Sequence, residues 1–168
     1  NGGWTIAKRL MQFERDSIAG SLGAGNIGQT VAMPTIPEAA KAALGVEADG
    51  RLADPDLRRR ITDHLMENRA FQLTMKRAAD DARSSNGPSN TAAIMKYAGA
   101  KLAQERNELL IEAFGLDGLG WEGEGYSDPQ VMPVRCWLRS QATSDEGGTS
   151  TQTLQSVAKR VPFDARCT

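Results

Sequence analysis

The stretch that decides the fold is PDLRRRITDHLMENRAFQLTMKRAADDA, residues 55–82. Its apolar side chains recur every three or four residues, which gathers them along one face of an α-helix. Asp54 followed by Pro55 is a typical helix start, because aspartate caps free N–H groups and proline fits the first helical position. We therefore expect a long helix from about Pro55 to Ala82, with one face formed by Leu57, Ile61, His64, Leu65, Asn68, Phe71, Met75, Ala78 and Ala82.

The segments on either side repeat the helical pattern. Residues 89–114 predict a third long helix with Ile94, Tyr97, Lys101, Leu102, Glu105, Leu109 and Ala113 along one side, and Gly115 is placed to end it. Shorter helices are expected at residues 37–44, 130–142 and 153–161. Pro133 is tolerable only in the first turn of its helix.

The first long helix is expected in WTIAKRLMQFERDSIAGSL, residues 4–22, which Gly2 and Gly3 precede and several glycines up to Gly28 follow. Each glycine costs about 1 kcal/mol in a helix, so we expect a neighbouring backbone to lie close to the Gly20–Gly28 region. Alanine, leucine, arginine and glutamate dominate the long segments, and alternating runs of β-branched residues are missing. The sequence therefore predicts an all-α, antiparallel up-and-down bundle that forms one domain over residues 1–168.

The composition narrows the class of function. The chain has 168 residues and a formal net charge of -1, so nothing points to a nucleic-acid or anionic-membrane partner. Two cysteines, Cys136 and Cys167, do not make a disulfide framework, and this usage favours a cytoplasmic protein. No apolar run is long enough to span a bilayer, and no secretory signal is visible.

The segment DEGGTSTQTLQSVAKR, residues 145–160, carries the strongest signal of a binding site. A glycine-rich turn that leads into a helix presents N–H groups and the positive end of the helix dipole. Thr149 and Ser150 add hydroxyl donors. Such a turn fits an anionic or electron-rich ligand. The alternative is a simple capping turn with a solvated Glu146.

In their order, four segments resemble the C-terminal helical domain of flavin-dependent acyl-CoA dehydrogenases. They are GGWTIAKRLMQFERDSIAG, LADPDLRRRITDH, GPSNTAAIMKYAGAKLAQERNELLIEAFG and RSQATSDEGGTSTQTLQSVAKRV. The resemblance implies an oxidoreductase that uses FAD to convert an acyl-CoA into a trans-2-enoyl-CoA, and it implies a homo- or hetero-oligomer that assembles through the bundle. It also implies that the chain is a fragment of a longer enzyme with an N-terminal helical domain and a central β-domain. We expect the isolated fragment to be inactive and to bind FAD weakly or not at all.

The resemblance also assigns roles to residues of the turn. In the family this turn lies against the flavin and the thioester, which implies cofactor binding by Gly148, Thr149 and Thr151. Many relatives carry the catalytic glutamate directly before the Gly-Thr pair, where this chain has Gly147. Glu146 lies one residue early, so we do not assign it the role of the base.

Glu14 is the candidate catalytic base. Some relatives carry the base on the first long helix, directly before an arginine, and Glu14 and Arg15 match that pair. Removing a carboxylate partly from water strengthens it as a base toward a weakly acidic C–H group, and Phe13 and Ile18 nearby are consistent with an apolar cleft. Arg15 matches an arginine that lines the substrate-side pocket. The alternative for both is an ion pair on the helix surface.

Two departures from the family support a second interpretation. Many relatives follow the first helix with an arginine and a phenylalanine that contact the flavin of a partner subunit, whereas residues 30–45 contain no such motif. Together with Gly147, this gap is also consistent with a non-catalytic subunit that builds an oligomer interface. A helix-bundle adaptor is a third, more general possibility.

The remaining residues with possible chemistry favour structural roles. His64 lies on the face of the second long helix, and we interpret it as a satisfied core or interface histidine. With one histidine and two distant cysteines, no metal-binding cluster is visible. We interpret Trp4, Trp121 and Trp137 as packing residues.

Overall fold

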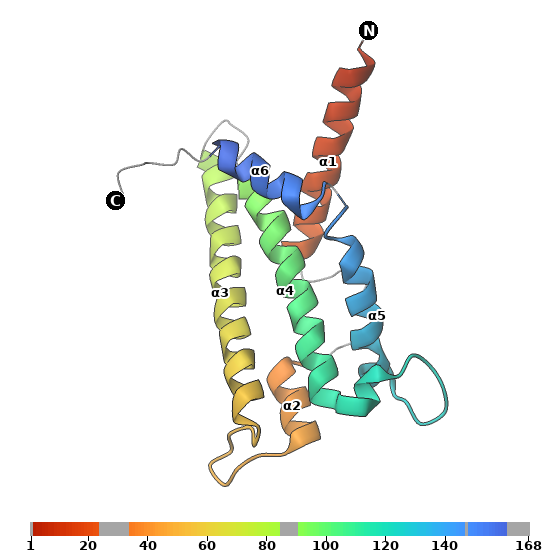
Figure 1. Cartoon of the computed structure of the whole chain (residues 1–168). Coiled ribbons are helices and arrows are strands. Elements are labelled where there is room, and N and C mark those ends of the chain that lie inside the picture. The colour runs from red at the N-terminus through yellow and green to blue at the C-terminus, as the bar shows by residue number, and fades with distance from the viewer. Residues whose placement is uncertain (1, 24–33, 85–90, 147, 161–168) are drawn as a thin grey trace. The chain divides into compact units, whose positions relative to one another are not determined.

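A computed structural model of the chain describes residues 2–23, 34–84, 91–146 and 148–160 (Figure 1). Within these ranges the chain forms α-helices and one short 3-10 helix, which confirms the all-α fold class. The predicted glycine contact after residue 23 lies outside the described residues. The elements are α1 (Gly3–Gly23), α2 (Ile36–Leu44), α3 (Pro55–Ser84), α4 (Thr91–Phe114), η1 (Gly115–Leu119), α5 (Asp128–Ala142) and α6 (Ser150–Arg160).

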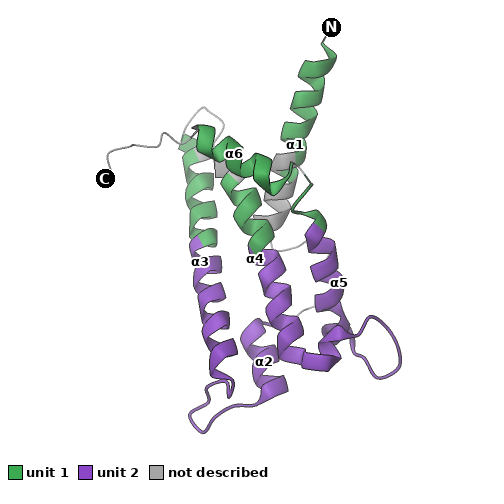
Figure 2. Cartoon of the chain, in the orientation of Figure 1, with its two compact units in different colours: residues 1–27, 71–101, 142–168 green, residues 28–70, 102–141 purple. Residues whose placement is uncertain are grey.

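The helices divide into two compact units (Figure 2). Unit 1 contains residues 1–27, 71–101 and 142–168, and unit 2 contains residues 28–70 and 102–141. Helices α3 and α4 each contribute residues to both units. The prediction of a single domain over the whole chain stays a prediction.

The helices of unit 2 run antiparallel to their neighbours, as the sequence predicted. Between α3 and α4, Arg60 pairs with Glu112 at 2.6 Å and His64 with Glu105 at 2.9 Å. Residue numbers therefore rise along one helix as they fall along the other. The same inverse order joins α4 to α5, where Gln104 Nε2 donates to the Ser140 carbonyl and Trp137 Nε1 donates to Glu108 Oε1.

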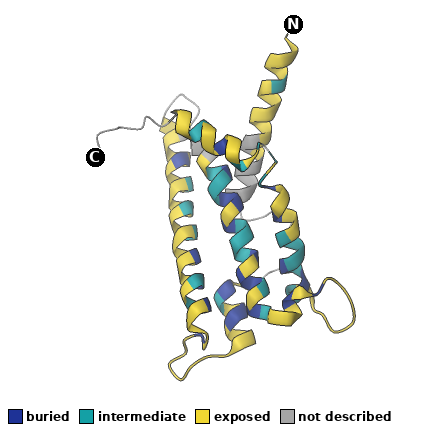
Figure 3. Cartoon of the chain, in the orientation of Figure 1, coloured by how far each residue is buried: buried dark blue, intermediate teal, exposed yellow. Residues whose placement is uncertain are grey.

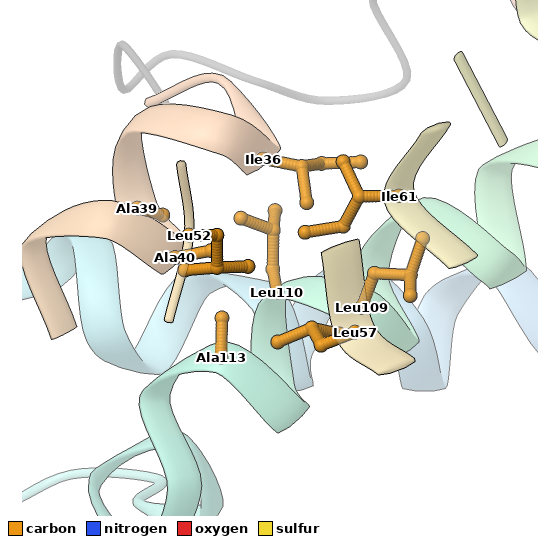
Figure 4. Packing of buried hydrophobic residues seen from close by; sticks show 9 residues of the cluster. All are labelled: Ile36, Ala39, Ala40, Leu52, Leu57, Ile61, Leu109, Leu110 and Ala113. Carbon is orange, nitrogen blue, oxygen red and sulfur yellow. The ribbon is translucent and has the colours of Figure 1, made fainter. Parts of the chain in front are cut away.

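The apolar core of unit 2 lies where α2 packs on the first half of α3 and the second half of α4. Figure 4 shows these side chains pointing toward one another. Leu110 is fully buried and Leu109 is 1% exposed. Burying one such side chain stabilises a fold by roughly 1.5–3 kcal/mol. The cluster consists of Ile36, Ala39, Ala40, Leu52, Leu57, Ile61, Leu109, Leu110 and Ala113.

Local capping signals define the starts of α2 and α3. The N–H of Leu57 donates to Asp54 Oδ1 at 2.9 Å, which confirms the predicted cap of α3. Thr35 and Glu38 form a reciprocal capping box at the start of α2. A glycine marks the C-terminal end of α4. Gly115, the residue after that helix, adopts a φ of 57°, a left-handed conformation that favours glycine. The 3-10 helix η1 begins at this glycine and ends at Leu119.

Two C-terminal helices begin earlier than the sequence predicted. Helix α5 starts at Asp128 rather than near Gln130, and Pro133 therefore lies in its second turn rather than its first. Helix α6 starts at Ser150 rather than near Thr153. Helix α6 starts earlier than predicted because Thr149 caps it: the Thr149 hydroxyl accepts a hydrogen bond from the Gln152 N–H.

Candidate functional site

The turn between α5 and α6 is closed by its own backbone. The carbonyl oxygen of Ser144 accepts hydrogen bonds from the Ser150 N–H at 3.0 Å and from the Ser150 hydroxyl at 3.3 Å. Inside this loop the Gly148 N–H donates to the Asp145 carbonyl at 3.2 Å. Gly148 has a φ of 106°, which side-chain-bearing residues rarely adopt. The turn is therefore a defined structure that requires a glycine at position 148.

Thr149 is the N-cap of α6. Its hydroxyl oxygen accepts from the Gln152 N–H at 3.3 Å, and its carbonyl accepts from the Thr153 N–H at 2.9 Å. Both Thr149 and Thr151 are exposed. Because the N–H groups of Gly148, Ser150 and Gln152 are used within the chain, the amides of Thr149 and Thr151 are the ones at this turn to consider for a ligand.

Lys96 is the residue of this region that the sequence analysis missed. It lies in the first half of α4 with 2% exposure, among the most completely buried large side chains of the chain. Its Nζ donates to the Gly148 carbonyl at 2.7 Å and to the Ser144 carbonyl at 3.1 Å. A signal was present, because Gly99, Ala100 and Ala103 follow it at helical spacing and form a face of small residues.

The alternative interpretation of the turn predicted that water surrounds Glu146. Glu146 is half-buried, and its N–H donates to the Ala142 carbonyl at 2.9 Å in the last turn of α5. The residue that caps α6 is Thr149 and not an acid. The structure also keeps Glu146 on the α5 side of Gly148, one residue before the position at which relatives carry their glutamate.

The candidate base Glu14 lies on α1 and is exposed, while the side chain of Arg15 lies outside the described residues. Most of the described side chains of α1 are exposed, as Figure 3 shows. An exposed carboxylate needs apolar cover from elsewhere before it becomes a strong base toward carbon. The surface beside it is suited to be covered, because the exposed large apolar residues of α1 are Trp4, Ile6, Leu10, Met11 and Phe13.

All of the predicted site residues fall in one compact unit. Unit 1 contains both α1, which carries Glu14, and the turn before α6 with the start of that helix. The second segment carries Gly148, Thr149 and Thr151. Lys96 belongs to the same unit. Segments from opposite ends of the chain therefore contribute to unit 1, which is what a composite site requires.

His64, Trp121 and Trp137 belong to unit 2, whereas Trp4 lies on α1 with 65% exposure, so its predicted packing role is not seen in the described chain. His64 is 2% exposed and its Nδ1 lies 2.9 Å from Glu105 Oε2 in unit 2, which confirms a satisfied core histidine. Trp137 is half-buried, and its Nε1 donates to Glu108. Trp121 is 50% exposed and lies under the guanidinium of Arg135, so it packs against a cation rather than into a core.

The described residues offer neither a cluster of metal ligands nor a helix that could cross a membrane. No group of three or more histidine, cysteine, aspartate or glutamate side chains in residues 2–23, 34–84, 91–146 and 148–160 could hold a metal ion. Across the same ranges, none of the helices combines the length and the apolar character that crossing a membrane requires.

Comparison with known proteins gives one match. The profile of the family described as acyl-CoA dehydrogenase, C-terminal domain, matches residues 1–161. Neither a curated protein nor a solved structure matches the chain. The matched range includes Glu14, Lys96 and the whole turn before α6.

Proposed function

Because this chain belongs to the acyl-CoA dehydrogenase family, as its C-terminal domain, we propose that it forms part of an FAD-dependent acyl-CoA dehydrogenase. The reaction is the α,β-dehydrogenation of an acyl-CoA thioester to a trans-2-enoyl-CoA. The observation that supports this proposal most is the turn before α6, where Gly148 and Thr149 match the Gly-Thr pair of the family, while Thr151 stands where many relatives have glutamine.

The residues of the turn fit a flavin. Oxygen and nitrogen atoms along the edge of the isoalloxazine ring accept hydrogen bonds, and the turn offers exposed N–H and hydroxyl groups at the positive end of α6. In this proposal the backbone around Gly148 approaches the ring, and Thr149 and Thr151 donate to it. When bound, FAD supplies the acceptor for the hydride that leaves the β-carbon of the acyl chain.

Glu14 is the proposed catalytic base, and it takes the α-proton of the acyl-CoA. Its carboxylate is exposed in this chain, so the water around it must be excluded by the acyl chain and by other parts of the enzyme. The exposed apolar residues of α1 provide the surface on which that cover packs. Arg15, the next residue, is proposed to line the substrate side of the same pocket.

The proposal makes the chain one part of a longer, oligomeric enzyme. An N-terminal helical domain and a central β-domain would supply the remaining flavin contacts, and a second subunit would pack against the bundle. We expect the 168-residue piece by itself to lack dehydrogenase activity. Stoichiometric FAD retained by this piece through gel filtration would contradict the expectation.

A non-catalytic subunit is the second candidate function. Two observations favour it: Gly147 stands where many relatives carry their glutamate, and Glu14 is exposed. In this alternative the chain builds the interface beside an active partner, which carries the catalytic carboxylate.

Purification of the full-length protein separates the two candidates. An active enzyme is expected to be yellow, with the absorption bands of bound flavin, and to lose that colour when a saturated acyl-CoA reduces it in the absence of oxygen. A colourless protein that gains flavin only together with a second polypeptide would contradict the first candidate and support the second.

A further inference from the structure

One buried charge in unit 1 is not used by the proposed reaction. The ammonium group of Lys96 is enclosed in the protein, with 2% of the residue exposed. Burying an ammonium ion is costly unless its donors find acceptors. Two of its acceptors belong to the turn before α6, namely the carbonyls of Ser144 and Gly148.

The shorter of these bonds determines the orientation of one peptide group. Nζ of Lys96 lies 2.7 Å from the Gly148 oxygen, and the described chain has no cis peptide bond. In a trans peptide the C=O and the following N–H point in opposite directions. Because the Gly148 carbonyl points toward the buried ammonium, the Thr149 N–H points away from it.

The turn needs such a constraint because glycine does not supply one. Gly148 has no Cβ, so its backbone adopts conformations on both sides of the Ramachandran map at little cost. Its φ of 106° is one choice among several for a glycine in an exposed turn. The longer bond, 3.1 Å from Lys96 to the Ser144 carbonyl, ties the other end of the turn to the same ammonium group.

We propose that Lys96 is a positioning residue that orients the Gly148–Thr149 peptide group, so that the Thr149 N–H is presented to the ligand of the turn. The identity of that ligand as FAD rests on the proposed function. The orientation of the peptide does not rest on it, because the orientation follows from the hydrogen bond between Lys96 and the Gly148 carbonyl.

The first test measures amide hydrogen exchange in the full-length protein. Lys96→Met keeps the length and the apolar stem of the side chain and removes the ammonium group. We expect exchange in residues 144–153 to become about tenfold faster or more, because two charge-assisted hydrogen bonds are lost. Peptides from the end of α3 are expected to exchange as in the wild type.

Lys101→Met is the matched control, since Lys101 lies on the same helix and is exposed. It is expected to leave the turn unchanged. If Lys96→Met does not fold, Lys96→Gln takes its place, because a neutral amide still reaches one carbonyl and is expected to give a smaller acceleration. Wild-type exchange at the turn in the folded variant would overturn the proposal. An equal acceleration throughout unit 1 would also overturn it, because it would show a general role in stability.

The second test uses the flavin. In the full-length protein, Lys96→Met is expected to weaken FAD binding by about tenfold or more and to shift the visible absorption of bound flavin, while Lys101→Met does neither. A loosened turn with unchanged flavin absorption would support the role of Lys96 in the turn and contradict the contact between turn and flavin. A wild-type protein without flavin would contradict the proposed function and leave the exchange test as the measure of this inference.

Discussion

Units 1 and 2 are stabilised in different ways. Unit 2 buries leucine, isoleucine and valine side chains from four helices and one loop, including Leu52, Leu57 and Leu110. In the described part of unit 1 the buried apolar residues are Ala78 and Ala100, and the buried polar ones are Lys96, Thr143 and Thr153. Large apolar side chains are exposed in both units, among them Trp4, Leu10 and Phe13 in unit 1 and Met66, Leu116 and Trp121 in unit 2.

The two units therefore differ in how much large apolar side-chain burial the described residues show. Unit 2 has a core of its own, and apolar burial of this kind is the main favourable term in folding. Unit 1 has polar contacts around a turn and an apolar surface that is open to a partner. The predicted site residues belong to unit 1, whose described part buries fewer large apolar side chains than unit 2.

The largest effect on stability is expected in the core of unit 2. Leu110→Ala removes a side chain with no exposure and leaves a cavity, which costs about 2–5 kcal/mol of unfolding free energy. Leu116→Ala is the control, because Leu116 is 84% exposed and its loss should cost less than about 0.5 kcal/mol. Urea denaturation of the 168-residue chain measures both. Equal losses of unfolding free energy in the two variants would show that the buried Leu110 does not stabilise unit 2 more than an exposed leucine does.

A smaller effect is expected at the turn of unit 1. Gly148→Ala places a side chain on a residue with a φ of 106°, and such backbone strain costs of order 1–3 kcal/mol. Gly2→Ala is the control, since a Cβ there meets nothing within 4 Å. Amide exchange should locate the damage in residues 144–153. Damage in α2 instead would show that the units are not separate in stability.

The next effect concerns the cap of α2 in unit 2. Thr35→Ala removes the capping box and should lower the melting temperature by about 2–4 °C. Hydrogen bonds from the Thr35 hydroxyl and then from its N–H lower the pKa of Glu38 below its ordinary value of 4.5. A lowered carboxyl pKa stabilises the fold above the ordinary value, and this contribution is lost as the pH falls through the lowered one. The difference between wild type and variant should therefore shrink below pH 4.5; a difference that grows in acid would contradict the contact.

The smallest effect is expected on α1. Leu10 is 68% exposed, so Leu10→Ala should change the unfolding free energy of the 168-residue chain by less than about 0.5 kcal/mol. In the full-length protein the same change should cost clearly more, because this surface is proposed to be covered there. Equal small effects in both proteins, measured by chemical denaturation, would contradict the proposed cover.

The features that the sequence predicted well depend on neighbouring residues. Asp54 and Pro55 mark the start of α3, and Gly115 marks the end of α4, because a cap is made within a few positions along the chain. The fold class follows from helical spacing over long segments. The start of α6 was missed by three residues because the hydroxyl of Thr149 was assigned to a ligand, whereas it also caps the helix.

The features that the sequence did not predict depend on distant contacts. The two carbonyls that accept hydrogen bonds from the buried Lys96 lie 48 and 52 residues further along the chain. The residues next to Lys96 in the sequence therefore could not predict its burial. Ile94, expected along the same side of α4 as Leu109, is 42% exposed. Glu14 stays a prediction as the base, since it is exposed among the described residues and none of them removes it from water.

The rate of flavin reduction in the full-length enzyme shows whether Glu14 of unit 1 is the base of an acyl-CoA dehydrogenase, as proposed. The measurement follows flavin absorption after rapid anaerobic mixing with saturated acyl-CoA thioesters. Glu14→Gln should slow the reduction by about 10²–10⁴, because one general base is lost while the shape is kept. Glu146→Gln should reduce flavin at nearly the wild-type rate. Reduction at the wild-type rate by Glu14→Gln would contradict the account, and an inactive Glu146→Gln would move the base to the turn.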